Sequence, residues 1–270
     1  MDHQAVLEQV VGWARSDHNI RAAVLTGSIA RDPEGADKEA DLDVELYVTN
    51  PSPLLQDDTW YEQFGEVLVV EALENPGWHP TRLVYYAEGE IDFMIAPAAI
   101  LSGSVVYDRP FRVLLDKDSA SSAFQRTART RGQRPTAADF LQCVHWFYAA
   151  TIMWAKYLAC DDPWAAKQRD WDSKKLLLTM LEWDHQARKG CDYDTWYLGT
   201  HLREWVDADL LGPIDACWSG FSRQDSLRAL RASLSLFDVL STRTATVLGI
   251  APFDATSVRR RIDQLLHALA

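Results

Sequence analysis

Cysteine is scarce in this sequence and is not arranged for metal binding. The chain has 270 residues and four cysteines, Cys143, Cys160, Cys191 and Cys217, with no C-x-x-C pair and no histidine at the spacing of a zinc ligand set. This pattern excludes a thiolate zinc site. We therefore expect reduced thiols with mostly structural roles.

Long apolar runs and a targeting segment are also missing. No stretch approaches the roughly 18 consecutive apolar residues of a membrane-spanning helix. The opening residues, Met-Asp-His-Gln-Ala-Val, lack the basic and apolar regions of a secretory signal. These absences predict a soluble, cytoplasmic protein.

Basic residues are too few to balance the acidic ones. The chain carries 39 acidic and 27 basic residues, which gives a formal net charge of −12. A negative surface repels the phosphates of nucleic acids and of anionic membranes, so sequence-independent binding to either is excluded. The excess of acid suits a cationic small-molecule partner, although the same charge also serves solubility alone. We expect a monomer.

The sequence does contain enough apolar residues for a sizeable core, and they follow two different periodicities. With 47% hydrophobic residues the chain can form one large domain or two small ones, and we expect two. Residues 1–118 show a helical pattern at 4–15 and then strand patterns at 20–26, 42–48, 67–73, 82–87 and 91–95, with a polar loop between the first two strands. Residues 119–270 show helical periodicity at 136–160, 164–189, 195–206, 223–248 and 255–269. The sequence therefore predicts an α+β fold in which a domain with a mixed sheet and helices precedes a helical bundle.

Two carboxylates lie two residues apart at the start of the second predicted strand. In a strand, residues i and i+2 share a face, so Asp41 and Asp43 point to one side and Leu42 to the other. Two carboxylates held this close repel each other unless a cation lies between them, and Mg²⁺ prefers carboxylate and phosphate oxygens as ligands. The pair predicts a site for a Mg²⁺-bound nucleotide, while a solvated strand edge is the simpler interpretation of an isolated Asp-x-Asp.

Residues near this pair in the predicted fold supply further parts of such a site. Gly27 lets the backbone approach a phosphate closely, Ser28 offers a hydroxyl, and Arg31 offers a planar cation. Asp92 lies within an apolar strand, where a carboxylate is costly without a metal or a catalytic role. We predict that Asp92 is the third carboxylate of the site.

A Gly-Ser turn after the first strand, Asp-x-Asp on the next strand and a lone Asp on a later strand together resemble the nucleotidyltransferase superfamily that includes polymerase β. The segment KKLLLTMLEWDHQARKGCDYDTWYLGTHLREW, residues 174–205, is similar to the aminoglycoside 6-adenylyltransferase family, the streptomycin-modifying enzymes. The segment AKYLACDDPWAAKQRDWDSK, residues 155–174, extends this similarity over nearly the whole chain. Two positions differ, because Ile29 follows the serine where the family usually has arginine, and Asp184 replaces the histidine after Glu-Trp.

The resemblance implies transfer of AMP from ATP to a hydroxyl of an aminoglycoside, with release of pyrophosphate. Asp41 and Asp43 would hold Mg²⁺ against the triphosphate, and Ser28 would bind the phosphate tail. Two roles stay open for Asp92, as ligand of a second metal ion or as general base on the acceptor hydroxyl, with the base favoured.

Three residues of the helical half are assigned to ligand binding. Lys167 belongs to a family-like W-x-x-K stretch and is assigned to the nucleotide phosphates, with a solvated surface lysine as the alternative. Glu182 and Asp184 are acids in a strongly apolar helix, and carboxylates bind guanidinium and ammonium groups, so both are assigned to the cationic acceptor. For Glu182 the alternative is an ion pair with a neighbouring helix.

We therefore expect a Mg²⁺-dependent adenylyltransferase that modifies streptomycin at its 6-hydroxyl and confers antibiotic resistance. Two other functions stay open. One is nucleotidyl transfer to another antibiotic, a metabolite or a protein hydroxyl, which Ile29 and Asp184 favour. The other is a non-catalytic nucleotide-binding module, which the intact set of three carboxylates argues against.

Overall fold

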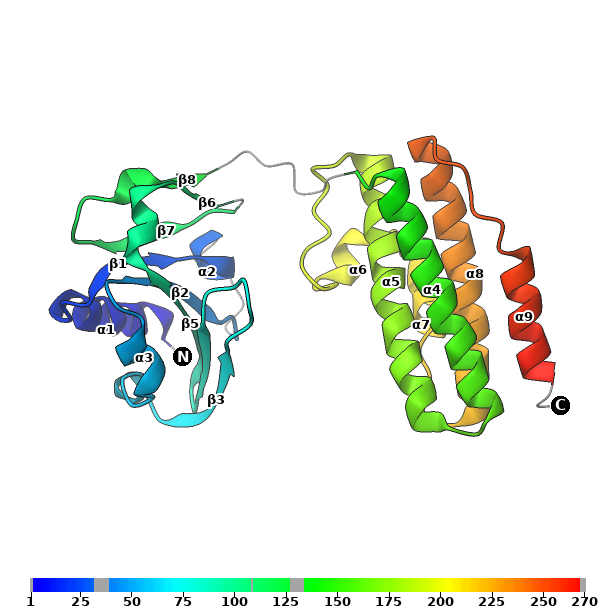
Figure 1. The fold of residues 1–270 in the computed structure, drawn as a ribbon, viewed down its shortest axis with the longest axis horizontal. Coiled ribbons are helices and arrows are strands. Elements are labelled where there is room, and N and C mark those ends of the chain that lie inside the picture. Colours follow the sequence, from blue (N-terminus) through cyan, green and yellow to red (C-terminus); the bar gives the residue numbers. More distant parts are fainter. Residues whose placement is uncertain (1, 32–38, 108, 127–133, 268–270) are drawn as a thin grey trace. The chain divides into compact units, whose positions relative to one another are not determined.

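The computed structural model describes residues 2–31, 39–107, 109–126 and 134–267. The chain divides into two compact units, Met1–Arg129 and Thr130–Ala270. The first is built on a β-sheet and the second from helices, which confirms the predicted α+β fold (Figure 1). The first unit extends past the predicted boundary at residue 118 because strand β8 (Phe124–Arg126) pairs with β6 (Val105–Tyr107).

A six-stranded mixed sheet organises the first unit. Its strands are β1 (Ile20–Leu25), β2 (Leu42–Val48), β3 (Val67–Leu73), β4 (Thr81–Tyr86), β5 (Gly89–Pro97) and β7 (Arg112–Asp116), in the order β3-β4-β5-β2-β1-β7. The central pair β2 and β5 is parallel, and every other neighbouring pair is antiparallel. The five predicted strands are confirmed as β1 to β5, with differences only at their ends.

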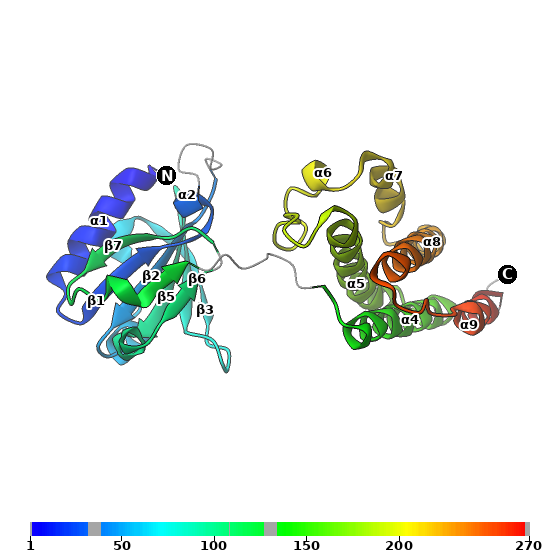
Figure 2. The ribbon, with the colours of Figure 1, turned by 90° about the horizontal axis from the view of Figure 1, so that it is seen from above.

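The two faces of this sheet are covered differently. Helix α1 (His3–Ser16) lies along one face (Figure 2), where it shares a core with the short helices α2 (Gly27–Arg31) and α3 (Ser52–Gln56) and with the 3₁₀ helix η1 (Glu62–Phe64). The small parallel sheet β6–β8 packs on the other face through Phe124, beside the 3₁₀ helices η2 (Ala98–Ser102) and η3 (Ser121–Ala123). Because strand residues alternate between faces, β2 sends Leu42 and Val44 into the α1 core and Asp43 to the opposite face.

One expectation about this unit is wrong. Residues 27–31 were predicted as the start of a polar loop, but they form α2 directly after β1. Ile29 is almost fully buried in the core shared with α1, which gives this short helix its anchor. The rest of the predicted loop, residues 32–38, lies outside the described residues.

The second unit is a helical bundle. Its helices are α4 (Ala137–Ala159), α5 (Pro163–Lys189), α6 (Leu202–Trp205), α7 (Ala208–Ala216), α8 (Arg223–Leu248) and α9 (Thr256–His267). Helices α4, α5 and α8 lie side by side in both views (Figures 1 and 2) and bury a common core, in which the rings of Phe147 and Phe237 stack 3.6 Å apart. Their starts follow from side-chain caps, since Thr136 caps α4, Asp162 caps α5 before Pro163, and Ser222 caps α8.

Four of the five predicted helices are confirmed, and residues 268 and 269 of the last one lie outside the described residues. The predicted helix at 195–206 is wrong, because only Leu202–Trp205 is helical and the preceding Trp196 and Leu198 have left-handed backbone conformations. Helix α7 was missed because Gly212 and Pro213 lie inside it. Within the described ranges, no helix combines the length and apolarity needed to cross a membrane.

Candidate active site

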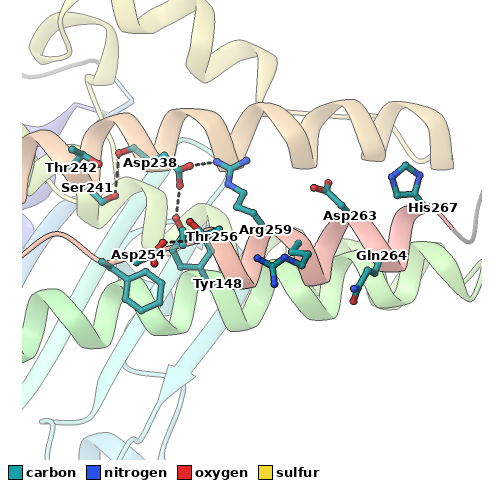
Figure 3. Close-up of a pocket in the computed structure, with 13 residues that line it drawn as sticks. Tyr148, Asp238, Ser241, Thr242, Asp254, Thr256, Arg259, Asp263, Gln264 and His267 are labelled. Carbon is teal, nitrogen blue, oxygen red and sulfur yellow. Dashed lines mark hydrogen bonds and ion pairs between the residues drawn. The ribbon is translucent and has the colours of Figure 1, made fainter.

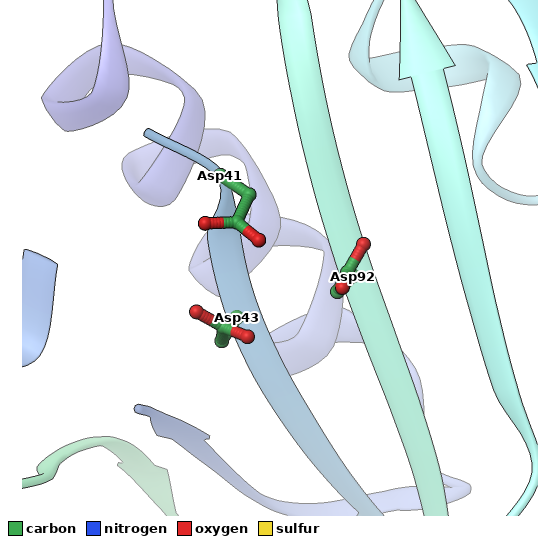
Figure 4. Close-up of side chains that lie close together, drawn as sticks. All are labelled: Asp41, Asp43 and Asp92. Carbon is green, nitrogen blue, oxygen red and sulfur yellow. The ribbon is translucent and has the colours of Figure 1, made fainter. Parts of the chain in front are cut away.

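Three carboxylates meet on the face of the sheet opposite α1. One oxygen from each of Asp41, Asp43 and Asp92 lies within 4.8 Å of the others (Figure 4). The parallel register of β2 and β5 places Asp43 directly beside Asp92, and Asp41 precedes β2 on the same face. The sheet therefore brings together residues that are about fifty positions apart in the sequence.

Burial and mutual repulsion make this cluster costly without a cation. Burial raises the pKa of Asp43 to about 7, and the nearby charge of Asp41 adds to the rise. Burial and the charge of Asp43 likewise raise the pKa of Asp92 to about 7. The Oδ1 atom of Asp92 is buried and has no hydrogen-bond partner among the described residues. A set of three carboxylates with an unsatisfied buried oxygen fits a hard divalent cation such as Mg²⁺, which takes oxygen ligands.

The segment that follows β1 contacts this cluster. Gly27 has a φ of +70°, and a Cβ atom built at this position would lie 1.7 Å from Oδ2 of Asp43. The Thr26 N–H donates a 2.9 Å hydrogen bond to the backbone oxygen of Asp43. The buried Ser28 hydroxyl has no hydrogen-bond partner in the part of the chain that the structure describes. Arg31 ends α2 and is half-buried. Gly27 thus lies beside the Asp43 carboxylate, and Ser28 follows it in the first turn of α2.

A second carboxylate group on the same face was missed. Glu45 continues the alternation of Asp41 and Asp43, and its Oε2 accepts a 2.8 Å hydrogen bond from the Tyr47 hydroxyl and a further one from Tyr107. The two hydroxyl oxygens are 2.8 Å apart. Burial raises the pKa of Glu45, and the two hydroxyl donors limit the rise. The period of two residues from Asp41 was the signal that could have included Glu45, but Tyr107 comes from β6, which the sequence pattern did not reveal.

Lys167 belongs to the helical unit, where neighbouring groups occupy its ammonium. Its Nζ atom donates to Oδ2 of Asp170 at 3.2 Å, to the Ser219 backbone oxygen at 2.9 Å, and to the Ser219 hydroxyl. Asp170 also accepts a hydrogen bond from the buried Lys174, whose ammonium lies 4.7 Å from the centre of the Trp154 ring. An ammonium has three protons, so Lys167 can bind a phosphate only by exchanging one of these contacts.

Asp184 is fully buried and is held by two arginines. Its oxygens accept hydrogen bonds from Nε and Nη2 of Arg188 at 3.1 and 2.8 Å, and from the same two nitrogens of Arg243 at 2.6 Å each. Arg188 also contacts Asp207 at 2.5 Å, so the cluster ties α5 to α8 and to the start of α7. The structure therefore gives Asp184 a role in stability, in contrast to its predicted contact with an acceptor.

Glu182 is placed differently from Asp184, although both belong to α5. It lines a cavity of about 530 Å³ together with Trp183, Trp196 and Tyr197. Among the described residues no side chain forms a hydrogen bond or ion pair with the Glu182 carboxylate, so the predicted alternative of an ion pair with a neighbouring helix is not found there.

Another cavity of the helical unit has a different character. It has a volume of about 740 Å³ and lies where α4, α8 and α9 meet (Figure 3). Asp238 of α8 accepts hydrogen bonds from the Tyr148 hydroxyl of α4 and from Arg259 of α9. Tyr148, Asp238 and Arg259 satisfy one another, so this cavity differs from the carboxylate cluster, where a buried oxygen lacks a partner among the described residues.

A mixed sheet bearing Gly-Ser next to three clustered carboxylates, followed by a helical unit, defines a nucleotidyltransferase. The chain belongs to the streptomycin adenylyltransferase family, whose profile matches residues 1–263. An aminoglycoside 6-adenylyltransferase of Campylobacter jejuni is 22% identical over 253 residues, covering 90% of this chain and 88% of the relative. An aminoglycoside 6-adenylyltransferase of Bacillus subtilis (strain 168) is 25% identical over 203 residues, covering 70% of this chain and 71% of the relative.

A solved structure is also similar to this chain. The crystal structure of an aminoglycoside 6-adenyltransferase from Bacillus subtilis is 18% identical to this chain. The match covers 98% of both chains with a TM-score of 0.48.

Proposed function

We propose that this enzyme transfers AMP from ATP to a hydroxyl of an aminoglycoside in a Mg²⁺-dependent reaction, with the 6-hydroxyl of streptomycin as the acceptor and antibiotic resistance as the result. The observation that carries the proposal is the carboxylate cluster of Asp41, Asp43 and Asp92, whose oxygens lie within 4.8 Å of one another. The family to which the chain belongs, and the names of the two relatives, support adenylyl transfer and the class of acceptor.

Asp41 and Asp43 are the residues that hold Mg²⁺ in this proposal. When bound, the ion neutralises charge on the triphosphate and on the departing pyrophosphate. Gly27 keeps the backbone close to Asp43, and the Ser28 hydroxyl, which no described residue hydrogen-bonds, would bind the phosphate tail. Arg31 adds a cationic donor from the end of α2.

Asp92 acts as the general base in this proposal. The acceptor hydroxyl oxygen forms a bond to the α-phosphorus of ATP, the bond from that phosphorus to pyrophosphate breaks, and the hydroxyl proton passes to Asp92. No described residue hydrogen-bonds the buried Oδ1 of Asp92, which leaves it available to accept that proton. The register of β2 and β5 sets Asp92 beside Asp43.

The helical unit supplies ligand contacts in the same proposal. Lys167 reaches the phosphates by exchanging its contacts with Ser219. Glu182 binds a positive charge of the acceptor because it faces a cavity and lacks a partner among the described residues. Asp184 is left out of the proposal, since Arg188 and Arg243 already occupy its oxygens.

The test is pyrophosphate release by the purified protein with ATP and Mg²⁺ across streptomycin, spectinomycin, kanamycin and a lincosamide, with mass spectrometry of the products. The expected result is streptomycin carrying one AMP, with no product when Mg²⁺ is chelated. A product formed only with another acceptor would keep the nucleotidyl transfer and remove streptomycin from the proposal.

A further inference from the structure

We propose that the cavity between α5 and residues 195–198 binds a guanidinium group of the acceptor, with Glu182 as its counter-ion. The proposal rests on the proposed function, because it names the chemical group that this enzyme reads on its acceptor. The cavity has a volume of about 530 Å³, and both of its sides belong to the helical unit.

The Glu182 carboxylate lines the cavity without a charged partner in the described ranges. Glu182 lies half-buried on α5 beside Leu178 and Trp183, and no described side chain forms a hydrogen bond or ion pair with it. Burial alone raises the pKa of Glu182 to about 7. Lys175 lines the same cavity but makes no ion pair with Glu182. A cationic ligand would supply the partner that the described residues do not provide.

Three aromatic side chains form part of the cavity walls. Trp183 of α5 and Trp196 and Tyr197 of the facing segment line the cavity around Glu182. Tyr197 is 68% exposed and Leu198 is 72% exposed, so these large side chains border the cavity without being needed in a core. A guanidinium group is planar and weakly hydrated and stacks on aromatic rings, whereas an ammonium group is a compact and strongly hydrated charge. Aromatic walls with one carboxylate therefore favour a guanidinium group.

Contacts within the protein hold residues 195–198, the segment that faces α5, in place before any ligand binds. The backbone is left-handed at three residues other than glycine, which is rare. The φ values are 56° at Trp196, 50° at Leu198 and 53° at His201. Three contacts keep the segment in this shape. The ring centres of Trp196 and His201 lie 4.1 Å apart, and the backbone N–H of Trp196 donates to the Asp194 carboxylate. The side-chain amide of Gln186 on α5 donates to the Thr195 hydroxyl at 3.4 Å. A preformed wall loses little entropy on binding.

The test is calorimetric binding without ATP, with streptomycin, which bears guanidinium groups, its diguanidino fragment streptidine, and kanamycin, which bears only amines. The parent protein should bind streptomycin and streptidine and bind kanamycin at least tenfold more weakly. Glu182→Gln should weaken streptomycin binding at least tenfold, and Tyr197→Ala should weaken it severalfold. Asp215→Asn, which changes an exposed acid of α7, is the matched control and should leave binding unchanged.

The outcomes separate this inference from the proposed function. Unchanged streptomycin binding by Glu182→Gln and Tyr197→Ala, or equal affinity of the parent for kanamycin, would overturn the guanidinium site even if AMP transfer occurs. Tight streptidine binding that both variants weaken would support the site even if no AMP is transferred. Tyr197 is exposed, so its variant reports on the cavity even if Glu182→Gln fails to fold.

Discussion

A Cβ atom at position 27 would lie 1.7 Å from Oδ2 of Asp43, so Gly27 and Asp43 fit together only because glycine has no side chain. The residue is also in the left-handed region, with a φ of +70°, which an alanine tolerates poorly. The contact fixes the position of a carboxylate that the proposed function assigns to the metal. The contact between Gly27 and Asp43 therefore links the Gly-Ser turn to the proposed metal site.

Gly27→Ala should displace the Asp43 carboxylate and lower turnover by about 100-fold or more, because a shift of about 1 Å at a reacting centre can cost that much. Steady-state kinetics at several Mg²⁺ concentrations would measure the change. Gly12→Ala is the matched control, since a Cβ there meets nothing within 4 Å in the middle of α1. It should keep full activity, and equal activity of the two variants would contradict the assigned contact.

The raised pKa values of Asp43 and Asp92 predict how stability depends on pH when no divalent ion is present. The folded protein keeps these protons to about pH 7, whereas the unfolded chain loses them near pH 4. Binding these protons more tightly in the folded state adds to the free energy of unfolding. This contribution is complete below about pH 4 and is lost as the pH rises to about 7. Mg²⁺ should raise the thermal unfolding midpoint more at pH 8 than at pH 5, because it binds the charged carboxylates.

Differential scanning fluorimetry in EDTA and in Mg²⁺ would measure this difference. Asp43→Asn removes one of the two titrating groups, so it should flatten the pH dependence in EDTA and reduce the effect of Mg²⁺. An equal response to Mg²⁺ at both pH values, in the parent and in the variant, would rule out a metal site at this cluster.

The hydrogen bonds to Glu45 predict a stability effect in the first unit. Tyr107→Phe removes one of the two hydroxyl donors to a largely buried carboxylate, which should lower the free energy of unfolding by about 1–3 kcal/mol. Urea denaturation would measure the loss. In a double-mutant cycle with Tyr47→Phe the two losses should not add, because both hydroxyls serve the same oxygen. Additive losses would show that the two tyrosines act separately.

Much of the sheet and of the candidate site could be predicted from the sequence because both follow from a period of two residues. The apolar runs from Leu42 and from Ile91 predict strands, and the same alternation places Asp41 and Asp43 on one face. The sequence could not give the register, because pairing depends on contacts across the sheet. That register is what sets Asp43 beside Asp92.

The remaining parts depend on contacts that a sequence pattern does not contain. Glu182 and Asp184 look alike in the sequence, yet Arg243, from a helix about sixty residues away, neutralises only Asp184. The sequence pattern does not show that the Lys167 ammonium donates a hydrogen bond to the Ser219 backbone oxygen, because Ser219 lies about fifty residues away. The segment before α6 has apolar residues at helical spacing, but its left-handed residues break the helix. In each case tertiary packing overrides the local pattern.

Asp184→Asn should act on stability, because it removes the charge that Arg188 and Arg243 share. The loss should be about 3 kcal/mol, since breaking a buried ion pair leaves its partners without a counter-ion. Chemical denaturation and the KM for the acceptor should be measured on the same preparation. A higher KM with unchanged stability would return Asp184 to the acceptor site.

If Asp41, Asp43 and Asp92 form the active site, the turnover of Asp92→Asn must fall. The rate of AMP transfer should be compared between the parent, Asp92→Asn and Glu66→Gln, which changes an exposed acid of the same unit. We expect Asp92→Asn to lose at least 100-fold in kcat while remaining folded, because removal of a general base typically costs 10²- to 10⁴-fold. Glu66→Gln should keep the rate of the parent, and undiminished turnover by Asp92→Asn would contradict the assignment of the three carboxylates to the active site.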